Sequence, residues 1–477
     1  MLRRTLATAM RNGFKFHPDY KFKCGLEIHT QLKTKYKLFS LSKTSFNAPC
    51  NTEISYLDVG LPGSQPTLNP EALYLALRAA VALNCKVQPV SRFDRKHYFY
   101  PDQPLGYQIT QNFHPLAKDG YLELSELDSA TGKIRIEKIQ LEQDTGKKHG
   151  DIIDYNRADT PLIEVVTKPD FETIEQVLAF VKKYQLLVRH FDICSGDLET
   201  GAIRVDVNVN VNSSPRVEIK NLSTTGDILD ALKYEYNRQV GVLQSGGELE
   251  QQTRSWDGFA THLSRSKENA VDYRYVPDSE LPKIYLAEDI AQEIASIMPQ
   301  GPDEVLNKLT QKPHSLQLAH ARNLLIEPQM LKYYESFFDS YSQADAKKWM
   351  FQELLAGFSK EAKEFDPEVV KPEALAELAN SDLSHVSKRL ALRHMIQHGV
   401  SFDKAQAHLN LSNSSDVDAV PVDELCAQII EANHEVVERI QAGHKNAIEV
   451  LVGKAMKSTR GQVQASIFRE KFIELLL

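Results

Sequence analysis

The sequence predicts an α+β protein in which a sheet-containing body is followed by helices only. Residues from about 20 to 285 contain short stretches of alternating apolar and polar residues, separated by Pro and Gly turns and by helical stretches. From about Ala287 onward this alternation disappears, and apolar residues recur at helical spacing. We therefore expect a substantial antiparallel sheet in the body and an all-helical remainder.

Length and composition limit the class of protein. A chain of 477 residues is too long for one core, so about two to four domains are expected. Hydrophobic residues make up 42% and charged residues 25%, as in ordinary soluble globular proteins, and no apolar run of about 18 residues occurs. The net charge of -8 argues against a protein that coats nucleic acid through charge alone. Five scattered cysteines indicate free thiols in a reducing compartment.

The N-terminus has the composition of a mitochondrial targeting segment. Arg3, Arg4 and Arg11 occur before the first acid, Asp19, among apolar and small polar residues. We expect a presequence over residues 1–19 that is cleaved and has no place in the fold. A plain basic N-terminus is the alternative.

The remaining elements follow from periodicity and divide the chain into three units. The body, residues 20–286, has expected strands at 25–32, 134–141, 162–166, 203–211 and 217–219, and expected helices at 70–83, 174–191 and 228–244. The helical middle, residues 287–410, has expected helices at 287–298, 315–325, 328–340, 344–358 and 385–398, with breaks at Pro367 and Pro372. A tail at 411–477 begins with a turn-rich piece and continues as helices.

The strand 25–32 carries the first candidate site residues. Its alternation places Glu27, His29 and Gln31 on one face, and Leu26 and Ile28 on the other. A carboxylate and an imidazole two residues apart on a strand point into the same space, which suits a shared metal ion or an acid–base pair. The same pattern is typical of a solvated strand face.

Two further strands carry carboxylates. In 134–147, parity places Gln140, Glu142 and Asp144 on one face, and the strand ends in a Gly-Lys turn at Lys147 that suits a phosphate but lacks Walker spacing. Glu164 lies inside an otherwise apolar strand. Burial of that carboxylate is costly unless it is paired, protonated or bound to a metal. A structural ion pair with an arginine such as Arg157 is as reasonable as a metal site.

The strand 203–211 alternates almost perfectly. Its valines share one face, and Arg204, Asp206, Asn208 and Asn210 share the other. A mixed polar face of this kind suits the floor of a site for a polar substrate, although antiparallel sheets often expose such a face to solvent.

Two segments mix basic residues with other chemistry. The segment 93–102 combines bases with aromatic residues, a composition that stacks nucleic acid but also occurs in a core strand with a basic edge. Near the C-terminus, Lys454 and Lys457 share a helical face, and Arg460 follows at its end. This small cationic patch suits phosphates, and a solvated helix end is the alternative.

Together these motifs resemble one family. From about residue 22 to the end, the chain resembles the B subunits (GatB) of the aspartyl/glutamyl-tRNA amidotransferases, in their mitochondrial form. The segments that carry the resemblance are 25–32, 60–63, 95–111, 141–147, 156–167, 201–208, 217–221, 272–278 and 452–461. The resemblance implies a cradle domain built on an antiparallel sheet, a helical domain and a tail domain that contacts tRNA.

The resemblance also implies an activity and partners. Enzymes of this family are ligases that form a C–N bond. They activate the glutamate of mischarged Glu-tRNA(Gln) with ATP as a γ-phosphoryl ester and displace the phosphate with ammonia. Ammonia comes from glutamine, hydrolysed by a separate amidase (the A component of the complex), since nothing in this chain resembles an amidase nucleophile segment. A small third subunit, of the C type or a fungal replacement, completes the complex in the mitochondrial matrix.

Site residues are assigned by position in the matching motifs. The magnesium site of the family maps onto Glu27, His29, Glu142 and Glu164, and Mn²⁺ is an alternative because an imidazole is an unusual Mg²⁺ ligand. For the cations that meet the phosphates and ATP, charge and motif position favour Lys147 and Arg204, then Arg95 and Lys220. Asp206 is a candidate to orient ammonia, and Lys454, Lys457 and Arg460 are candidates to bind tRNA.

One departure from the family concerns zinc. Bacterial members carry cysteine pairs that hold a structural zinc, whereas the matching positions here are Ser40, Ser42, Ser55 and Asp58. Four thiolates are therefore missing, and we expect no structural zinc. A second departure is Gln143, where the family often has glutamate.

A non-catalytic scaffold that presents tRNA to the amidase is the rival hypothesis. The tail patch and the aromatic segment fit it. The carboxylate face does not, because tRNA repels a carboxylate cluster that lacks a metal. Convergence of the four metal-site side chains on one point is the geometry that separates the two hypotheses.

Overall fold

The computed structural model describes residues 14, 16–266, 273–341, 345–411, 422–441, 445–459, 463 and 465–476. The chain forms two compact units, Met1–Pro302 and Asp303–Leu477. Within the described residues, the first contains the strands together with four α-helices, and the second is helical. The predicted α+β class is therefore confirmed.

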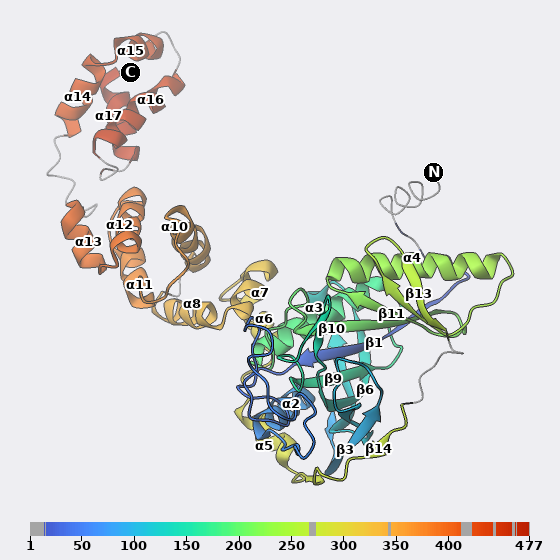
Figure 1. Cartoon of the computed structure of the whole chain (residues 1–477). Helices are drawn as coiled ribbons and strands as arrows, with labels where there is room; N and C mark the ends of the chain where they lie inside the picture. The colour runs from blue at the N-terminus through green and yellow to red at the C-terminus, as the bar shows by residue number, and fades with distance from the viewer. Residues whose placement is uncertain are drawn as a thin grey trace. The chain divides into compact units, whose positions relative to one another are not determined.

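A nine-stranded sheet forms the first unit, in the order β13-β12-β11-β10-β1-β9-β6-β5-β2 (Figure 1). Neighbouring strands are antiparallel except for β11 and β12, which are parallel. The strands of this sheet are β1 (Phe22–Gln31), β2 (Lys86–Val87), β5 (Ala117–Leu124), β6 (Gly132–Gln143), β9 (Pro161–Thr167), β10 (Ile203–Val211), β11 (Val217–Leu222), β12 (Gln252–Trp256) and β13 (Thr261–Ser266).

Strand β1 lies in the interior of this sheet, between β9 and β10. Across it, His29 pairs with Glu164 of β9 on one side and with Arg204 of β10 on the other, and Glu27 pairs with Asp206 of β10. Directly paired residues point to the same face of a sheet. The period-two pattern of three separate segments therefore places their polar side chains on one shared face, in agreement with the parity that the sequence indicates for each strand.

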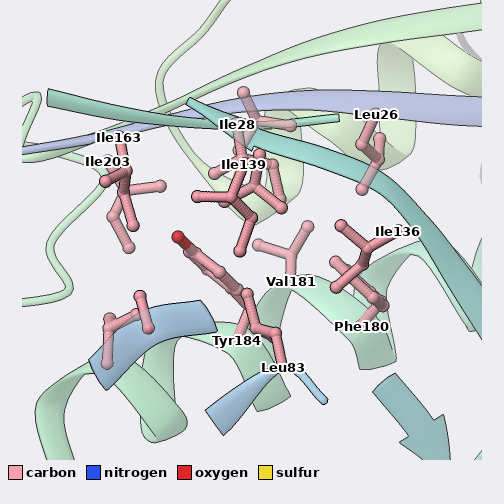
Figure 2. Close-up of a cluster of buried hydrophobic side chains, with 14 of the residues drawn as sticks. Leu26, Ile28, Leu83, Ile136, Ile139, Ile163, Phe180, Val181, Tyr184 and Ile203 are labelled. Carbon is pink, nitrogen blue, oxygen red and sulfur yellow. The ribbon is translucent and has the colours of Figure 1, made fainter. Parts of the chain in front are cut away.

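The opposite face is apolar and is covered by helices α2 (Pro70–Ala82), α3 (Ile174–His190) and α4 (Thr225–Gln244). Figure 2 shows the centre of this core, where Ile28 and Ile139 from the sheet meet Phe180 and Tyr184 from α3. The buried Tyr184 hydroxyl shares a 2.7 Å hydrogen bond with the Thr30 side chain. The helices begin at capping residues whose side chains accept backbone N–H bonds, namely Asn69, Thr173 and Thr224.

A smaller sheet packs near the polar face, beside β6. Strand β3 (Val90–His97) pairs with β4 (Tyr107–His114), β14 (Val276–Pro277) and β15 (Ile284–Tyr285). Side chains of β4 reach β6: Thr110 donates to Glu142, and Gln111 accepts the backbone N–H of Leu141. A separate hairpin, β7 (Lys147–His149) with β8 (Ile152–Asp154), follows β6.

The described helices continue to the C-terminus. They are α5 (Ile290–Ile297), α6 (Pro302–Thr310), α7 (Leu318–Ile326), α8 (Pro328–Ser340), α9 (Ala346–Lys348), α10 (Leu355–Lys360), α11 (Pro372–Asn380), α12 (His385–His398), α13 (Phe402–Leu409), α14 (Val422–Glu431), α15 (His434–Gln441), α16 (Ile448–Ser458) and α17 (Ala465–Leu476). A π-helical segment, Trp349–Leu354, joins α9 to α10. Helices α14 to α17 enclose an apolar core of their own that includes Leu451, Phe468 and Phe472.

Two boundaries differ from those expected from sequence. Helix α5 contacts α2 and lies within the first unit, so this unit extends past residue 286. Residues 1–13 and 15 of the expected presequence lie outside the described residues, but Phe14 and Phe16 pack against the core of the first unit. Phe14 and Phe16 therefore have a place in this fold, and the expected cleavage of residues 1–19 stays a prediction. None of the helices in the described ranges is both long and apolar enough to cross a membrane.

Candidate functional site

Three of the four predicted metal-site residues converge on the polar face of the large sheet. His29 comes from β1, Glu142 from β6 and Glu164 from β9. The His29 Nε2 atom lies 3.2 Å from Glu142 Oε1 and 4.0 Å from Glu164 Oε2. One ligand atom from each of the three residues lies within 4.8 Å of the others, and no other such group of His, Cys, Asp and Glu occurs among the described residues.

The pKa values of His29, Glu142 and Glu164 depend strongly on one another. Burial and the negative charge of Glu142 raise the pKa of Glu164 above its usual range. Burial also opposes ionisation of Glu142, but the hydrogen bond and positive charge of His29 outweigh it, and the pKa of Glu142 is lowered. Burial by itself lowers the pKa of His29, yet Glu142 and Glu164 raise it to about 9. Two carboxylates are thus held together around one cation, here the imidazolium.

The donor set fits a divalent cation. A metal ion would relieve the repulsion between the two carboxylates, and the His29 imidazole would lose its proton to act as a ligand. Two buried side-chain oxygens nearby, Gln140 Oε1 and Asn208 Oδ1, have no hydrogen-bond partner among the described residues. The Gln140 amide nitrogen donates to Glu164 over 2.6 Å, so its unpaired oxygen belongs to the same site. The oxygen ligands favour Mg²⁺, and a site that includes an imidazole is also suitable for Mn²⁺.

Glu27, the fourth predicted ligand, lies on the same face but outside the three-residue group. Its Oε1 atom accepts a 3.0 Å hydrogen bond from the Asn208 amide, on the neighbouring strand β10. Its charge still contributes to the raised pKa of Glu164. The structure therefore places Glu27 further along the polar face, and its role as a direct ligand stays a prediction.

Arg204 is anchored beside the cluster by a bidentate ion pair. Its two terminal nitrogens donate to the Asp144 carboxylate over 2.9 and 3.0 Å. Burial opposes the charged form of Asp144, but Arg204 and Arg157 outweigh it and lower its pKa. Arg157 also donates to the backbone carbonyls of Thr145 and Gly146. Arg157 is therefore engaged by Asp144 and by these carbonyls, and it does not form the ion pair with Glu164 that the sequence offered as an alternative.

A second ion pair lies on the β10 side of the same face. Lys220 Nζ is 2.5 Å from Asp206 Oδ2 and 3.0 Å from Glu218 Oε1. Burial opposes the charge of Lys220, but the two carboxylates raise its pKa above the ordinary value. Asp206 and Lys220 thus form one unit, although the sequence assigns them to separate roles.

Arg95 and Lys147, two of the residues predicted to meet the phosphates, have no described contact with the carboxylate cluster. Arg95 donates to Asp278 over 2.6 Å and stacks on the Tyr107 ring, so its charge is used within the β3–β4–β14 sheet. Lys147 is exposed on the β7–β8 hairpin, and no contact described in the structure joins it to the carboxylate cluster. Arg95 is engaged by Asp278, and the roles of Arg95 and Lys147 toward the phosphates stay predictions.

Lys96, the neighbour of Arg95, is a site residue that sequence reasoning missed. Burial lowers its pKa, but Glu142, Glu164 and two tyrosines outweigh this and raise it above the ordinary value. Its ammonium group lies 4.8 Å from the centre of the Tyr273 ring. The signal is present in the sequence, because Lys96 and Arg95 must face opposite sides of a strand. Treating the segment as a mixed basic and aromatic stretch overlooks that parity.

Ser40, Ser55 and Asp58, three of the positions at which the family resemblance implies missing zinc ligands, belong to a polar network. Asp58 is fully buried and accepts hydrogen bonds from Lys37 Nζ over 2.7 Å, Ser40 Oγ over 3.2 Å and the Ser55 backbone over 2.7 Å. A buried ion pair with additional hydrogen bonds satisfies both charges. This network joins Lys37 and Ser40 to Ser55 and Asp58, at the other end of the segment between them. The expectation of no structural zinc stays a prediction.

The predicted tRNA patch lies on the tail. Lys454 and Lys457 are exposed on α16, where Lys454 donates to the Asn433 side chain. Arg460 lies outside the described residues.

Comparison with known proteins gives a consistent result along the chain. The family described as "GatB/GatE catalytic domain" matches residues 22–292, and the one described as "GatB domain" matches residues 332–476. Proteins named as the mitochondrial B subunit of glutamyl-tRNA(Gln) amidotransferase are similar along nearly their whole length. One from Lodderomyces elongisporus is 67% identical, covering 98% of this chain and 93% of that protein. Others are from Candida tropicalis, at 58% identity with 97% and 98% covered, and Candida albicans, at 57% with 97% of each covered. The carboxylate cluster lies in the first matched range and the tail lysines in the second.

Proposed function

The chain belongs to the GatB family, and from this membership we propose that it is the B subunit of a mitochondrial glutamyl-tRNA(Gln) amidotransferase. In that role it converts the glutamate of Glu-tRNA(Gln) to glutamine in two steps. ATP phosphorylates the side-chain carboxylate, and ammonia then displaces the phosphate. The observation that carries this assignment is the convergence of His29, Glu142 and Glu164 from three strands beside two partly buried cations, Lys96 and Arg204.

The residues around the cluster have distinct tasks in this reaction. Lys96 and Arg204 neutralise negative charge on the phosphoryl group as it transfers between oxygens. Asp144 holds the Arg204 guanidinium in a fixed orientation through the bidentate pair. Preorganised charges of this kind act without reorganisation at the moment of reaction.

His29, Glu142 and Glu164 would hold the divalent ion, with Glu27 as a fourth candidate. When bound, such an ion neutralises the phosphates and orients the transferring group. Thr110 and Gln140 keep the two carboxylates in position through hydrogen bonds of 3.1 and 2.6 Å. These supporting contacts matter because carboxylate ligands need fixed orientations.

Ammonia has to arrive from a partner protein. We assign its delivery to the amidase of the complex, which also contains a small third subunit, in the mitochondrial matrix. Asp206, held by Lys220, faces the same side of the sheet as the cluster, and its carboxylate is of the kind that accepts hydrogen bonds from ammonia. Its place beside Glu27 in the strand register supports this positioning role.

The test is a Glu142→Gln variant in the purified complex. The substitution preserves shape but removes one charge from the cluster. We expect conversion of Glu-tRNA(Gln) to fall by at least about 100-fold, whereas glutamine hydrolysis by the partner and tRNA binding persist. Normal conversion would refute the metal assignment.

A matched control lies on the same strand. Glu137 is exposed in the middle of β6 and forms a surface ion pair with Lys168. Glu137→Gln should leave both conversion and tRNA binding unchanged. If both variants lost conversion equally, damage to β6 rather than loss of a ligand would be the cause. A complex that binds tRNA but hydrolyses no ATP in the wild type would favour the scaffold hypothesis.

A further inference from the structure

An N-terminal arm, formed by Phe14 and residues 16–21, is built into the first unit. The hydroxyl of Tyr236, on α4, accepts the backbone N–H of His17 over 3.0 Å and donates to the carbonyl of Tyr20 over 2.7 Å. Further along, Lys21 and Asn212 exchange hydrogen bonds of 2.8 Å, from the Lys21 N–H to the Asn212 side chain and from the Asn212 N–H to the Lys21 carbonyl. The arm is thus held at several points by hydrogen bonds to its backbone.

Aromatic packing holds the N-terminal part of the arm, Phe14 and Phe16, in place. The Phe16 ring lies 4.9 Å from the Tyr236 ring and 5.2 Å from the Phe22 ring, and the Phe14 ring lies 5.1 Å from Phe16 and 5.7 Å from Tyr236. Three of these four contacts are edge-to-face, the favoured geometry for aromatic pairs. Phe16 is central because it bridges α4 to the first residue of β1.

The position of the arm gives it a structural consequence. Phe22 opens β1, the strand that carries His29 seven residues later, and Tyr236 is almost completely buried. Removal of the arm would expose the Tyr236 ring and leave its hydroxyl without the two backbone partners. Exposure of a buried aromatic ring to water and loss of these hydrogen bonds both destabilise the surrounding fold.

We propose that this arm is part of the mature protein, and that the targeting segment is removed on the N-terminal side of Phe14. The proposal rests on the mitochondrial location assigned above. The step is hydrolysis of one peptide bond by water, which leaves a carboxylate on the released peptide and an amino group on the mature chain. It moves the processing boundary from residue 19, the end expected from composition, to the N-terminal side of Phe14.

The direct test is the N-terminus of the protein made in cells. The full chain, with a C-terminal tag, is expressed in yeast, purified from mitochondria with its partner subunits, and analysed by intact mass and N-terminal sequencing. We expect the dominant mature chain to have lost its first residues and to begin at or before Phe14, and an uncleaved chain in mitochondria would overturn the proposal. A dominant N-terminus after Phe14 would overturn the proposal. A chain found in the cytosol with Met1 in place would instead contradict the mitochondrial assignment, and the arm would then be decided by the second test.

The second test asks whether the arm stabilises the fold, wherever the protein resides. Complexes are made with chains that begin at Phe14 or at Lys21, and with Phe16→Ala in the full chain. Hydrogen exchange is measured at α4 around Tyr236 and at the start of β1. We expect the Phe14 start to match the full chain, and the Lys21 start and Phe16→Ala to exchange about tenfold faster.

Asp19→Ala is the matched control, because the Asp19 side chain is 81% exposed and its ion pair is with the nearby His17 ring. It should leave exchange unchanged. Equal exchange in the Phe14 and Lys21 chains would refute a structural role for the arm.

Discussion

Lys96 shows how a single side chain connects two sheets to one site. It starts from β3, in the small sheet, yet its charge acts on Glu142 and Glu164 in the large sheet. Arg95, one position earlier, is held by Asp278 and Glu280 instead. Adjacent basic residues on one strand therefore have separate roles, decided by which face each occupies.

Lys96→Met tests this role at the residue scale. Methionine keeps much of the length of the apolar stem and removes the charge. We expect the rate of Glu-tRNA(Gln) conversion at saturating substrate to fall by about 100-fold, because a fixed positive charge near the transferring phosphoryl group is lost. Single-turnover conversion measures this rate. Lys86→Met, at an exposed position of β2, is the control and should retain full activity.

Asp159 adds a pH-dependent contribution to stability. It is buried, and burial together with the charge of Asp58 raises its pKa to about 7. The folded protein therefore holds this proton more tightly than the unfolded chain, whose aspartate titrates near 3.8. The stabilisation is complete below about pH 4 and is lost as pH rises to about 7, amounting to at most about 4 kcal/mol.

We therefore expect the contribution of Asp159 to the free energy of unfolding to decrease between pH 5 and pH 8. Urea unfolding of the wild type and of Asp159→Asn measures this difference. The variant loses one acceptor, since Asp159 binds both the Phe39 N–H and the Gln143 amide. It should be less stable at pH 5, and the gap should narrow toward pH 8. A gap that is constant with pH would show that Asp159 is ionised throughout.

At the scale of elements, the close approach of β5 to the end of α2 is the tightest constraint. A side chain at Gly120 would place its Cβ atom 2.6 Å from the Leu83 carbonyl and 2.1 Å from Cys85 Sγ. The backbone N–H of Tyr121 donates to the same carbonyl over 2.9 Å. The strand and the helix end are thus in direct backbone contact, which only glycine permits.

Gly120→Ala should lower the free energy of unfolding by about 2–4 kcal/mol, because backbone has to move to admit the methyl group. Gly241→Ala is the opposite case. Gly241 lies inside α4 with open space around it, so alanine should stabilise the protein by about 0.5–1 kcal/mol. Urea unfolding midpoints of the two variants measure both effects. Equal effects of the same sign would contradict the packing argument.

On the whole-molecule scale, the proposed catalytic residues and the proposed tRNA-binding residues belong to different units. The carboxylate cluster belongs to Met1–Pro302, whereas Lys454 and Lys457 belong to Asp303–Leu477. A charge on the tail that meets a phosphate contributes to affinity through counterion release and leaves the chemistry of bound substrate unchanged. Binding and turnover should therefore respond to different substitutions.

Lys454→Ala combined with Lys457→Ala tests this separation. We expect a higher KM for tRNA, an unchanged kcat, and a slope of log Kd against log salt that is smaller by about two units. Lys471→Ala is the control, because Asp423 and Glu474 already neutralise that charge. Salt titrations of tRNA binding provide the measurement. An unchanged slope in the double variant would remove the tail lysines from the interface.

Local periodicity predicted much of the element list. Helices α8 and α12 and strand β10 have the expected bounds, and α2 and α3 differ at one end by a single residue. Strand β3 was an alternative for the segment 93–102, whereas strands β4, β5, β12 and β13 and helices α6, α11 and α13 were not predicted. These elements are short or mix charged residues with aromatic ones, so their stability comes from their sheet and helix neighbours rather than from a local pattern.

The sequence by itself determined the fold class, the family and the face that each carboxylate occupies, because strand parity is a local property and the family motifs are specific. Only the tertiary structure decided which polar residues meet. It brought His29, Glu142 and Glu164 together, placed Lys96 beside them, and paired Arg95 with Asp278. The physical reason is register: which residues lie opposite each other depends on long-range pairing of strands, and the distance between segments in sequence contains no information about that pairing.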